Sequence, residues 1–181
     1  VPNLNVHFLS TCTTFVEFTN LPDLQLDFPN PDQVGADLLV TALAGYRKAK
    51  GAVLIIDSGT ALTFSLVDSD GVYRGGQIFP GMGIASKSLN DYTAKVPVIN
   101  VEKVEFLVGN TTRHAVQSGL YHGYKSLIQG MMHHYRHIYS DLYVIGTGAG
   151  LDLFQDSLDF DAYEPYLIFD GLDYIADCLS G

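Results

Sequence analysis

The residues best suited to chemistry lie in a short polar turn between two apolar runs. The runs are Val53–Ile56 and Leu62–Leu66, and the turn between them reads Asp57-Ser58-Gly59-Thr60. One carboxylate, two hydroxyls and a glycine with unscreened backbone N–H groups can hold a phosphate and its counter-cation. The same residues are also typical of an ordinary hairpin whose aspartate hydrogen-bonds its own turn. The pattern leaves both interpretations open.

A second candidate carboxylate, Asp37, belongs to the helix expected before this hairpin. Apolar residues recur at helical spacing from Val34 to Tyr46, and cations followed by Gly51 mark a C-terminal end, which predicts an amphipathic helix over residues 32–50. Asp37 lies off the apolar arc, beside Gly35. It is either a solvated acid favoured by the helix dipole or a carboxylate that faces a cleft and accepts a proton.

A sheet is needed to hold the polar turn in place. The two apolar runs predict a pair of antiparallel strands, and residues 72–78 predict a third. In that third strand the pair Gly75-Gly76 indicates a bulge or a close backbone approach. Residues 142–145 predict a buried strand that ends in a glycine-rich turn.

The remaining segments predict helices and irregular connections. We expect a short helix through about Leu89, an irregular stretch over 91–108, a long helix over about 112–137 and a helix from Leu151. The chain is expected to end with a strand near 166–169 that passes into a terminal helix. Near the N-terminus, Val6–Leu9 and Phe15–Phe18 predict short strands or a short helix.

Two further motifs carry less specific signals. The turn Gly146-Thr147-Gly148-Ala149-Gly150 could attract phosphate, but it departs from the dinucleotide fingerprint at Leu151 and from the P-loop, because no Lys-Ser/Thr follows. His133 and His137 share a helix face at zinc-ligand spacing. The glutamate of the zinc motif is absent, so a solvated or packed role is favoured over zinc.

Composition limits the classes of partner. The chain has 20 acidic residues against 10 Lys plus Arg, a net charge of −10, which disfavours nucleic acid and anionic membranes. Its apolar runs are shorter than the roughly 20 residues that span a bilayer. Only Cys12 and Cys178 are present, and their spacing fits no disulfide framework. We therefore expect a cytoplasmic protein without nucleic-acid or membrane partners.

The order of the expected elements indicates the fold class. Three antiparallel strands, a helix, a parallel strand and a helix describe one lobe of the ribonuclease-H-like α/β fold, a mixed sheet flanked by helices. This lobe is duplicated in the ASKHA superfamily of actin-like ATPases. On this basis, residues 1–50 are expected to be the remainder of an N-terminal lobe and residues 51–181 a C-terminal ribonuclease-H-like lobe.

Taken in order, the motifs resemble those of the type III pantothenate kinases, also called the Bvg accessory factor family. The matching stretches are Asn30-Pro31 with Val34–Asp37, Asp57–Thr63, Gly75–Gly81, Gly109–Thr112 with Ser118-Gly119, Thr147-Gly148, and Leu167–Leu172. Each stretch is weak alone, and the six in family order are fairly specific.

The resemblance implies ATP-dependent phosphorylation of pantothenate to 4'-phosphopantothenate, the first step of coenzyme A synthesis. It implies that Asp37 is the general base, that Asp57 binds a monovalent cation (K⁺ or NH₄⁺), and that Gly59 and Thr60 meet the phosphates of ATP with Mg²⁺. It places pantothenate against Gly35, Ala36, Asp37, Leu38 and Thr112. It also implies a homodimer whose substrate pocket borrows residues from the partner.

Two departures from the family pattern qualify these expectations. The family continues from Gly-x-Asp into Arg, and Leu38 occupies that position here, although only Arg can grip a carboxylate through a bidentate fork. The family's opening Asp-x-Gly-Asn-Thr turn has no counterpart before Pro31, so the first lobe is expected to be incomplete. A shortened kinase, a catalytically degenerate dimeric binding or regulatory protein, and an ASKHA kinase for another small alcohol all remain open.

Overall fold

The computed structural model describes residues 21–180 as a mixed α/β structure. The elements expected at Val6–Leu9 and Phe15–Phe18 lie outside the described residues. Six strands form one sheet in the order β1-β4-β3-β2-β5-β6. Their bounds are Gln25–Leu26 (β1), Val53–Ser58 (β2), Ala61–Val67 (β3), Val72–Pro80 (β4), Tyr143–Thr147 (β5) and Ala162–Tyr163 (β6). Strands β2, β3 and β4 are antiparallel neighbours, whereas β5 runs parallel to β2 and to β6.

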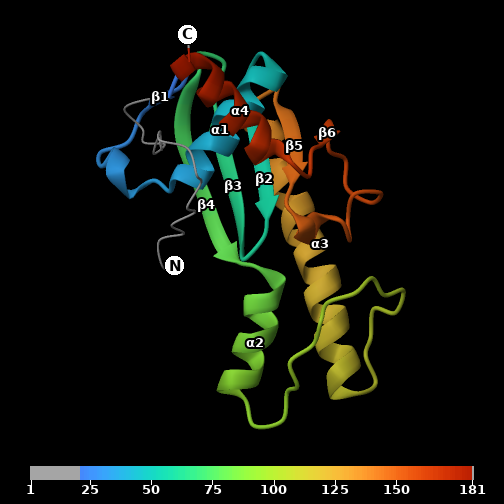
Figure 1. The fold of residues 1–181 in the computed structure, drawn as a ribbon. Helices are drawn as coiled ribbons and strands as arrows, with labels where there is room; N and C mark the ends of the chain where they lie inside the picture. The colour runs from blue at the N-terminus through green and yellow to red at the C-terminus, as the bar shows by residue number, and fades with distance from the viewer. Residues whose placement is uncertain (1–20, 181) are drawn as a thin grey trace.

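Helices cover both faces of this sheet (Figure 1). Helix α1 (Ala36–Ala49) and helix α4 (Leu167–Ser180) lie on one face, and the C-terminal half of helix α3 (Thr112–Ile138) lies on the other. Two short 3₁₀ helices, Pro31–Gln33 and Ala149–Leu151, precede α1 and follow β5. The expected helix over 32–50 is confirmed from Ala36 onward, and the long helix over 112–137 is confirmed almost to the residue.

Apolar side chains point alternately to the two faces of the sheet, so there are two apolar cores. Leu54, Ile56 and Phe64 pack toward α3, where they meet Ile128 and Met132. The residues between them on β2 and β3 point to the opposite face, which α1 and α4 cover. This second core contains Leu39, Leu43, Val53, Ile55, Val67, Ile145, Leu167 and Ile175. Because the side-chain period of a strand is two, each strand contributes to both cores.

The pair Gly75-Gly76 lies at both a β-bulge and a close backbone approach, the two features that the sequence indicates. The pairing of β3 with β4 shifts between Leu66 and Val67, and Gly75 has a φ of 86°. A Cβ built on Gly76 would lie 1.5 Å from the backbone oxygen of Phe64. Strands β3 and β4 therefore approach each other at a point that only glycine permits.

Replacing Gly76 by alanine should destabilise the protein by about 2–4 kcal/mol, because the methyl group must push β4 away from β3. Urea unfolding measures the change. The matched control is Gly83→Ala, since a Cβ at Gly83 on helix α2 (Met82–Tyr92) meets nothing within 4 Å. That control should leave stability unchanged or raise it by about 0.5–1 kcal/mol. Equal stability of the two variants would contradict the close approach of the strands.

Two predictions about the C-terminal region are wrong. The helix expected from Leu151 is only the 3₁₀ helix Ala149–Leu151 followed by turns, in which Phe154 N–H donates to the Leu151 carbonyl at 2.8 Å. The strand expected at 166–169 is instead the start of α4. Leu167, Gly171 and Ile175 recur at helical spacing, and their buried face lies against α1. A Cβ at Gly171 would lie 2.4 Å from the Val40 oxygen, so the two helices touch closely.

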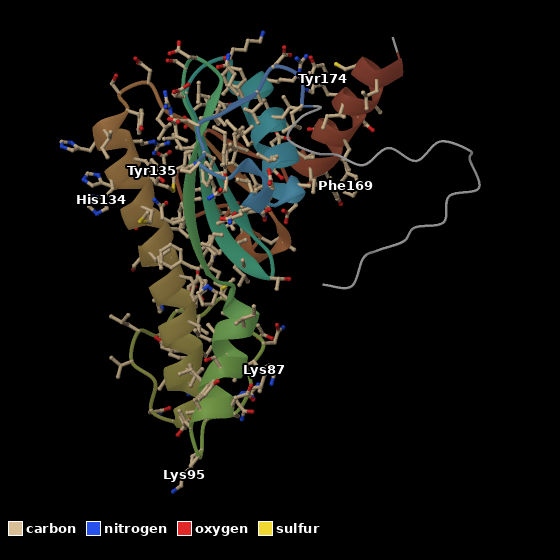
Figure 2. All side chains as sticks on the ribbon, turned by 90° about the vertical axis from the view of Figure 1, so that its left-hand side faces the viewer. Lys87, Lys95, His134, Tyr135, Phe169 and Tyr174 are labelled. Carbon is tan, nitrogen blue, oxygen red and sulfur yellow. The ribbon has the colours of Figure 1, made fainter. Side chains whose placement is uncertain are left out.

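Helix α2 (Met82–Tyr92) and the first half of α3 project beyond the sheet (Figure 1). Residues 93–111, which join the two helices, contain no helix or strand, as expected for an irregular stretch. Helix α3 begins with a capped end, because the Thr111 side chain accepts a hydrogen bond from His114 N–H at 3.1 Å. Figure 2 shows Lys87 and Lys95 toward the free end of this projection.

Candidate functional site

Asp57 occupies the end of β2 at the centre of the sheet. It pairs in register with Thr63 on β3 and with Thr147 on β5. Registered neighbours project from the same face of a sheet, so two hydroxyl groups flank the carboxylate on the face that α1 covers. Periodicity alone does not reveal Thr63 and Thr147 as site residues. The pairing register of the three strands is the signal that finds them.

Helix α1 brings Asp37 to the same edge of the sheet. The helix has 14 residues and rises about 21 Å, and the 6 residues of β2 span about 20 Å. Because only residues 50–52 connect them, helix and strand run in opposite directions over matching lengths. The start of α1 therefore lies level with the end of β2, and two aspartates 20 positions apart in sequence become neighbours.

The charge of Asp37 acts on the half-buried carboxyl group of Asp57. Burial raises the pKa of Asp57, and the negative charge of Asp37 raises that pKa further. The same charge also contributes to the raised pKa of Tyr73, although burial is the larger cause there. Within residues 21–180, no Lys, Arg or His forms an ion pair with Asp57. The site therefore carries an excess of negative charge.

Asp37 is solvent-exposed and held in the first turn of α1. Its Oδ1 accepts a hydrogen bond from Leu38 N–H at 2.9 Å. Gly35 precedes the helix without a side-chain cap, and a Cβ at Gly35 would lie 2.5 Å from that same Oδ1. The absence of a side chain at Gly35 leaves room for the exposed Asp37 carboxylate.

The polar turn next to Asp57 is fixed by backbone contacts. Gly59 N–H donates to the Ala61 carbonyl at 2.8 Å, and Gly81 N–H donates to the Thr60 carbonyl at 3.0 Å. A Cβ at Gly81 would lie 2.4 Å from the Gly59 oxygen. The turn thus rests on the start of α2 and leaves Gly59 and Thr60 exposed to a ligand.

The glycine-rich turn after β5 packs against the polar turn. Gly148 has a φ of 85°, and a Cβ there would lie 2.3 Å from Asp57 Oδ1. A Cβ at Gly150 would lie 2.3 Å from Ser58 Oγ. These approaches explain why glycines occupy the turn, and they place its backbone beside the residues expected to meet phosphate.

Two cavities lie near this edge of the sheet, one beside the turn and one beside the start of α1. The first, of about 400 Å³, is lined by Ser58, Gly59, Gly83, Gly150 and Asp152 with neighbouring residues of the 99–101 loop. The second, of about 120 Å³, is lined by residues of α1, β3 and β4, including Val34, Leu38, Thr63, Ser65 and Tyr73. The larger cavity therefore adjoins the turn, and the smaller one adjoins the start of α1, where Leu38 follows Asp37.

Asp152 lines the larger cavity and contacts Tyr163, and the sequence singles out neither residue. Tyr163 on β6 donates a hydrogen bond to Asp152 Oδ1, at the wall of the larger cavity. Burial raises the pKa of Tyr163, and this hydrogen bond raises it further. Asp152 thereby presents a fixed carboxylate within reach of a ligand hydroxyl. The only sequence signal is its place directly after the glycine-rich turn.

The structure brings together all but one of the expected site residues. Gly35, Ala36, Asp37, Leu38, Asp57, Gly59 and Thr60 gather at one edge of the sheet. Thr112 does not join them, because it begins α3 at the free end of the projection (Figure 1).

The histidines of α3 do not assemble a metal centre in the described part of the chain. Between residues 21 and 180, no group of three or more His, Cys, Asp or Glu side chains could hold a metal ion. Figure 2 shows His134 pointing away from the sheet on the outer side of α3. His133 lies beside a small surface cavity that Arg136 and Asp159 also line. Exposed surface positions are the interpretation that fits His133 and His137.

The fold and this sheet edge fit the class of α/β kinases. Such enzymes need a carboxylate that accepts the proton of the acceptor hydroxyl and backbone N–H groups that bind phosphates. The family model for type III pantothenate kinase matches residues 4–134. The chain belongs to the type III pantothenate kinase family.

Curated relatives support this assignment. A type III pantothenate kinase of Persephonella marina is 34% identical over 95% of this chain and 71% of its own length. That of Exiguobacterium sibiricum is 37% identical over 84% of this chain and 60% of its own length. That of Paramagnetospirillum magneticum is 38% identical over 74% of this chain and 52% of its own length. The chain thus spans between about half and 71% of the length of these relatives.

A solved structure has a similar fold. It is the crystal structure of a conserved protein from Campylobacter jejuni, described as a Baf family transcriptional activator, with a TM-score of 0.58. The similarity covers 89% of this chain and 72% of that chain at 20% sequence identity. At this level of identity, the similarity establishes the fold alone.

Proposed function

We propose that this protein transfers the γ-phosphoryl group of ATP to the primary hydroxyl of pantothenate, which gives 4'-phosphopantothenate and ADP. The observation that carries the proposal is that Asp37 and Asp57 lie at the same edge of the sheet, beside a glycine-lined turn that borders the larger cavity. The sheet order and strand directions support the ribonuclease-H-like, ASKHA-type fold. Within that proposal, residues 1–50 belong to an N-terminal lobe and residues 51–181 to the C-terminal lobe.

Asp37 is the proposed general base. Its exposed carboxylate takes the proton of the acceptor hydroxyl as the hydroxyl oxygen attacks the γ-phosphorus and the bond to the β–γ bridging oxygen breaks. Substrate lies against Gly35–Leu38, and the smaller cavity extends from that point along β3 and β4.

ATP is the proposed ligand of the larger cavity. The exposed backbone of Gly59 and Thr60 and the hydroxyl of Thr60 face the phosphates, and the close approach of Gly148 and Gly150 keeps side chains out of their path. Asp152, held by Tyr163, is positioned to accept a hydrogen bond from a ribose hydroxyl. Mg²⁺ would accompany the nucleotide and neutralise the charge that develops on its phosphates.

A monovalent cation, K⁺ or NH₄⁺, is the proposed partner of Asp57. The donor set fits, because a half-buried carboxylate without a cationic partner among residues 21–180 lies between the hydroxyls of Thr63 and Thr147. Such hard oxygen ligands suit alkali cations. The bound cation would offset the repulsion between the two carboxylates.

We propose a homodimer formed through the projection of α2 and α3. Large apolar side chains are exposed there, including Tyr92 at 88%, Leu107 at 72% and Val108 at 84%. A second copy would cover them, and it would give Thr112, which is remote from Asp37 of its own chain, a site in the partner. The proposed location is the cytoplasm, and within residues 21–180 no helix has the length and apolarity needed to cross a membrane.

Introducing aspartate at Val108 should convert the dimer to a monomer, because a buried unpaired charge costs several kcal/mol. Light scattering coupled to size-exclusion chromatography measures the mass. The matched control is Leu172→Asp, which places the same charge on an exposed position of α4. A dimer that survives Val108→Asp, or a monomeric wild-type protein, would contradict the proposed interface.

The decisive test of the function is an assay of ADP release and of phosphopantothenate formation in potassium buffer, with and without pantothenate. It should be run on this chain and on one extended upstream through any encoded residues, because the chain spans only part of its relatives. Pantothenate-dependent turnover in either chain supports the proposal. Absence of pantothenate-dependent turnover in both chains would favour a binding or regulatory role.

A further inference from the structure

One wall of the larger cavity comes from a segment without regular structure. Ile99, Asn100 and Val101 line the cavity, and they belong to the stretch 93–111, which contains no helix or strand. Such a stretch lacks the ladder of backbone hydrogen bonds that fixes the residues of a strand. Its position beside a ligand therefore depends on side chains from neighbouring elements that bind its backbone.

Ser86 of α2 binds this wall at Ile99. Its hydroxyl donates a hydrogen bond to the Ile99 carbonyl at 2.9 Å and accepts one from Ile99 N–H at 2.8 Å. Ser86 is fully buried and Ile99 is 4% exposed, so water cannot replace these bonds without a movement of the segment. One side chain thus satisfies both backbone polar groups of a residue that lines the cavity.

Helix α2 connects this wall to the polar turn. Gly81 N–H, at the start of α2, donates to the Thr60 carbonyl at 3.0 Å. Ser86 follows five positions later, about 7.5 Å along the helix axis. Met82 and Gly83, which lie between these two contacts, line the cavity. The first turns of one helix therefore set the distance between the turn proposed to face the phosphates and the wall.

Other side chains bind the same stretch at residues that do not line the cavity. Asn90 donates to the Val96 carbonyl at 2.7 Å, and Ser118 of α3 donates to the Leu107 carbonyl at 2.6 Å. Of the side-chain hydrogen bonds that the described residues make to the backbone of 93–111, only those of Ser86 reach a residue of the cavity wall. The position of the wall thus depends on Ser86 in particular.

Resting on the proposed function, we propose that Ser86 is a positioning residue for ATP, which holds the 99–101 wall at the distance from the polar turn that the nucleotide requires. Ser86 is not among the residues that line the cavity, so it acts through Ile99. Asp37, the proposed base, lies on a different element, at the start of α1. Ser86 therefore governs the affinity for nucleotide, and it affects neither the affinity for pantothenate nor the rate of phosphoryl transfer.

Equilibrium binding of ADP with Mg²⁺ tests the proposal without requiring turnover. Ser86→Ala removes both hydrogen bonds and keeps a residue that favours a helix. Calorimetry should show that ADP binding is weakened by about tenfold or more and that pantothenate binding is unchanged. Where turnover is measured, KM for ATP should rise by a similar factor, while kcat stays within about twofold. An equal loss of affinity for both ligands, or unchanged ADP binding in folded Ser86→Ala protein, would overturn the proposal.

The matched control is Ser118→Ala. It removes the hydrogen bond of another buried serine, 4% exposed, that binds the same stretch at Leu107. ADP binding by this variant should stay within about twofold of the wild type, because Leu107 does not line the cavity. A loss of ADP affinity equal to that of Ser86→Ala would show a general effect of loosening the segment, and the specific role of Ser86 would be wrong.

Hydrogen exchange on the wild-type protein adds a test that does not depend on the folding of a variant. Amide protons of residues 96–102 should exchange more slowly when ADP is bound, because the nucleotide packs against the wall that Ser86 holds. Unchanged exchange in this segment at saturating ADP would contradict the proposal, as would failure of the wild-type protein to bind ADP.

The proposed function fails in a distinguishable way. If Ser86→Ala weakens ADP binding as expected but the wild-type protein transfers no phosphoryl group to pantothenate, the role of Ser86 is supported and the kinase reaction is not. If the wild-type protein phosphorylates pantothenate and Ser86→Ala raises KM for both substrates alike, the kinase reaction is supported and the role of Ser86 is not.

Discussion

Replacing Asp37 by asparagine should lower the rate of phosphoryl transfer by about 100- to 10,000-fold, the range lost when a general base is removed. Asparagine keeps the size of the side chain but cannot accept the proton of the acceptor hydroxyl. The rate of ADP release at saturating ATP and substrate measures the effect. Because Asp37 is exposed at the surface, the free energy of unfolding should change by no more than about 0.5 kcal/mol.

The control for this prediction is Asp32→Asn, which removes one exposed negative charge just before α1. It should keep nearly the full rate. A loss of less than about tenfold in Asp37→Asn, or equal losses in both variants, would remove Asp37 from the role of general base. The conclusion would then be that the carboxylate contributes only to the local charge.

Replacing Asp57 by asparagine should have opposite effects on stability and on function. Because burial and Asp37 raise the pKa of Asp57 in the folded state, its contribution to stability is complete below the unfolded-state pKa and is lost as pH rises through the folded-state pKa. At neutral pH the ionised group therefore costs stability. The asparagine side chain carries no charge, so Asp57→Asn should raise stability at pH 7 by about 1 kcal/mol, or about 2–4 °C in Tm.

The same substitution should abolish the response to potassium. A cation that binds the folded state raises Tm in proportion to its affinity, so wild-type protein should melt at a higher temperature in KCl than in choline chloride. Asp57→Asn should show no such difference, and its stability should depend less on pH above about pH 4. The control Asp70→Asn changes an exposed turn and should behave like the wild type. A potassium response that persists in Asp57→Asn would exclude Asp57 as the cation ligand.

Local patterns predicted the elements that hold the site. The hairpin of β2 and β3, helix α1 and helix α3 all follow from apolar periodicity with clear end signals, such as Gly51 and Thr111. The two errors, at Leu151 and at 166–169, concern short apolar segments whose conformation is decided by tertiary contacts. In α4, packing against α1 favours a helix in a segment that a short apolar run alone could not distinguish from a strand.

The geometry of the site depends on element lengths and strand register, which cannot be read directly from the sequence. Asp37 meets Asp57 only because α1 and β2 have matching lengths and a short connection. Thr63 and Thr147 flank Asp57 because of strand register, which is settled by packing on both faces of the sheet. The resemblance supplied Asp37 and Asp57 as a pair, whereas the effect of Asp37 on the pKa of Asp57 and the cavity beside Leu38 required coordinates.

The length of helix α3 fixes the distance between the tip of the projection and the sheet. It is one unbroken helix of 27 residues, about 40 Å long, that runs from the tip of the projection to the back of the sheet. Near its far end, Tyr135 donates a hydrogen bond to Gln77 of β4 at 2.8 Å, which ties the helix to the strand that lines the smaller cavity. In the proposed dimer, the spacing between the two substrate pockets would therefore be set by the number of turns in α3. Inserting or deleting one turn would move the partner's Thr112 by about 5.4 Å while preserving the face of the helix that meets the sheet.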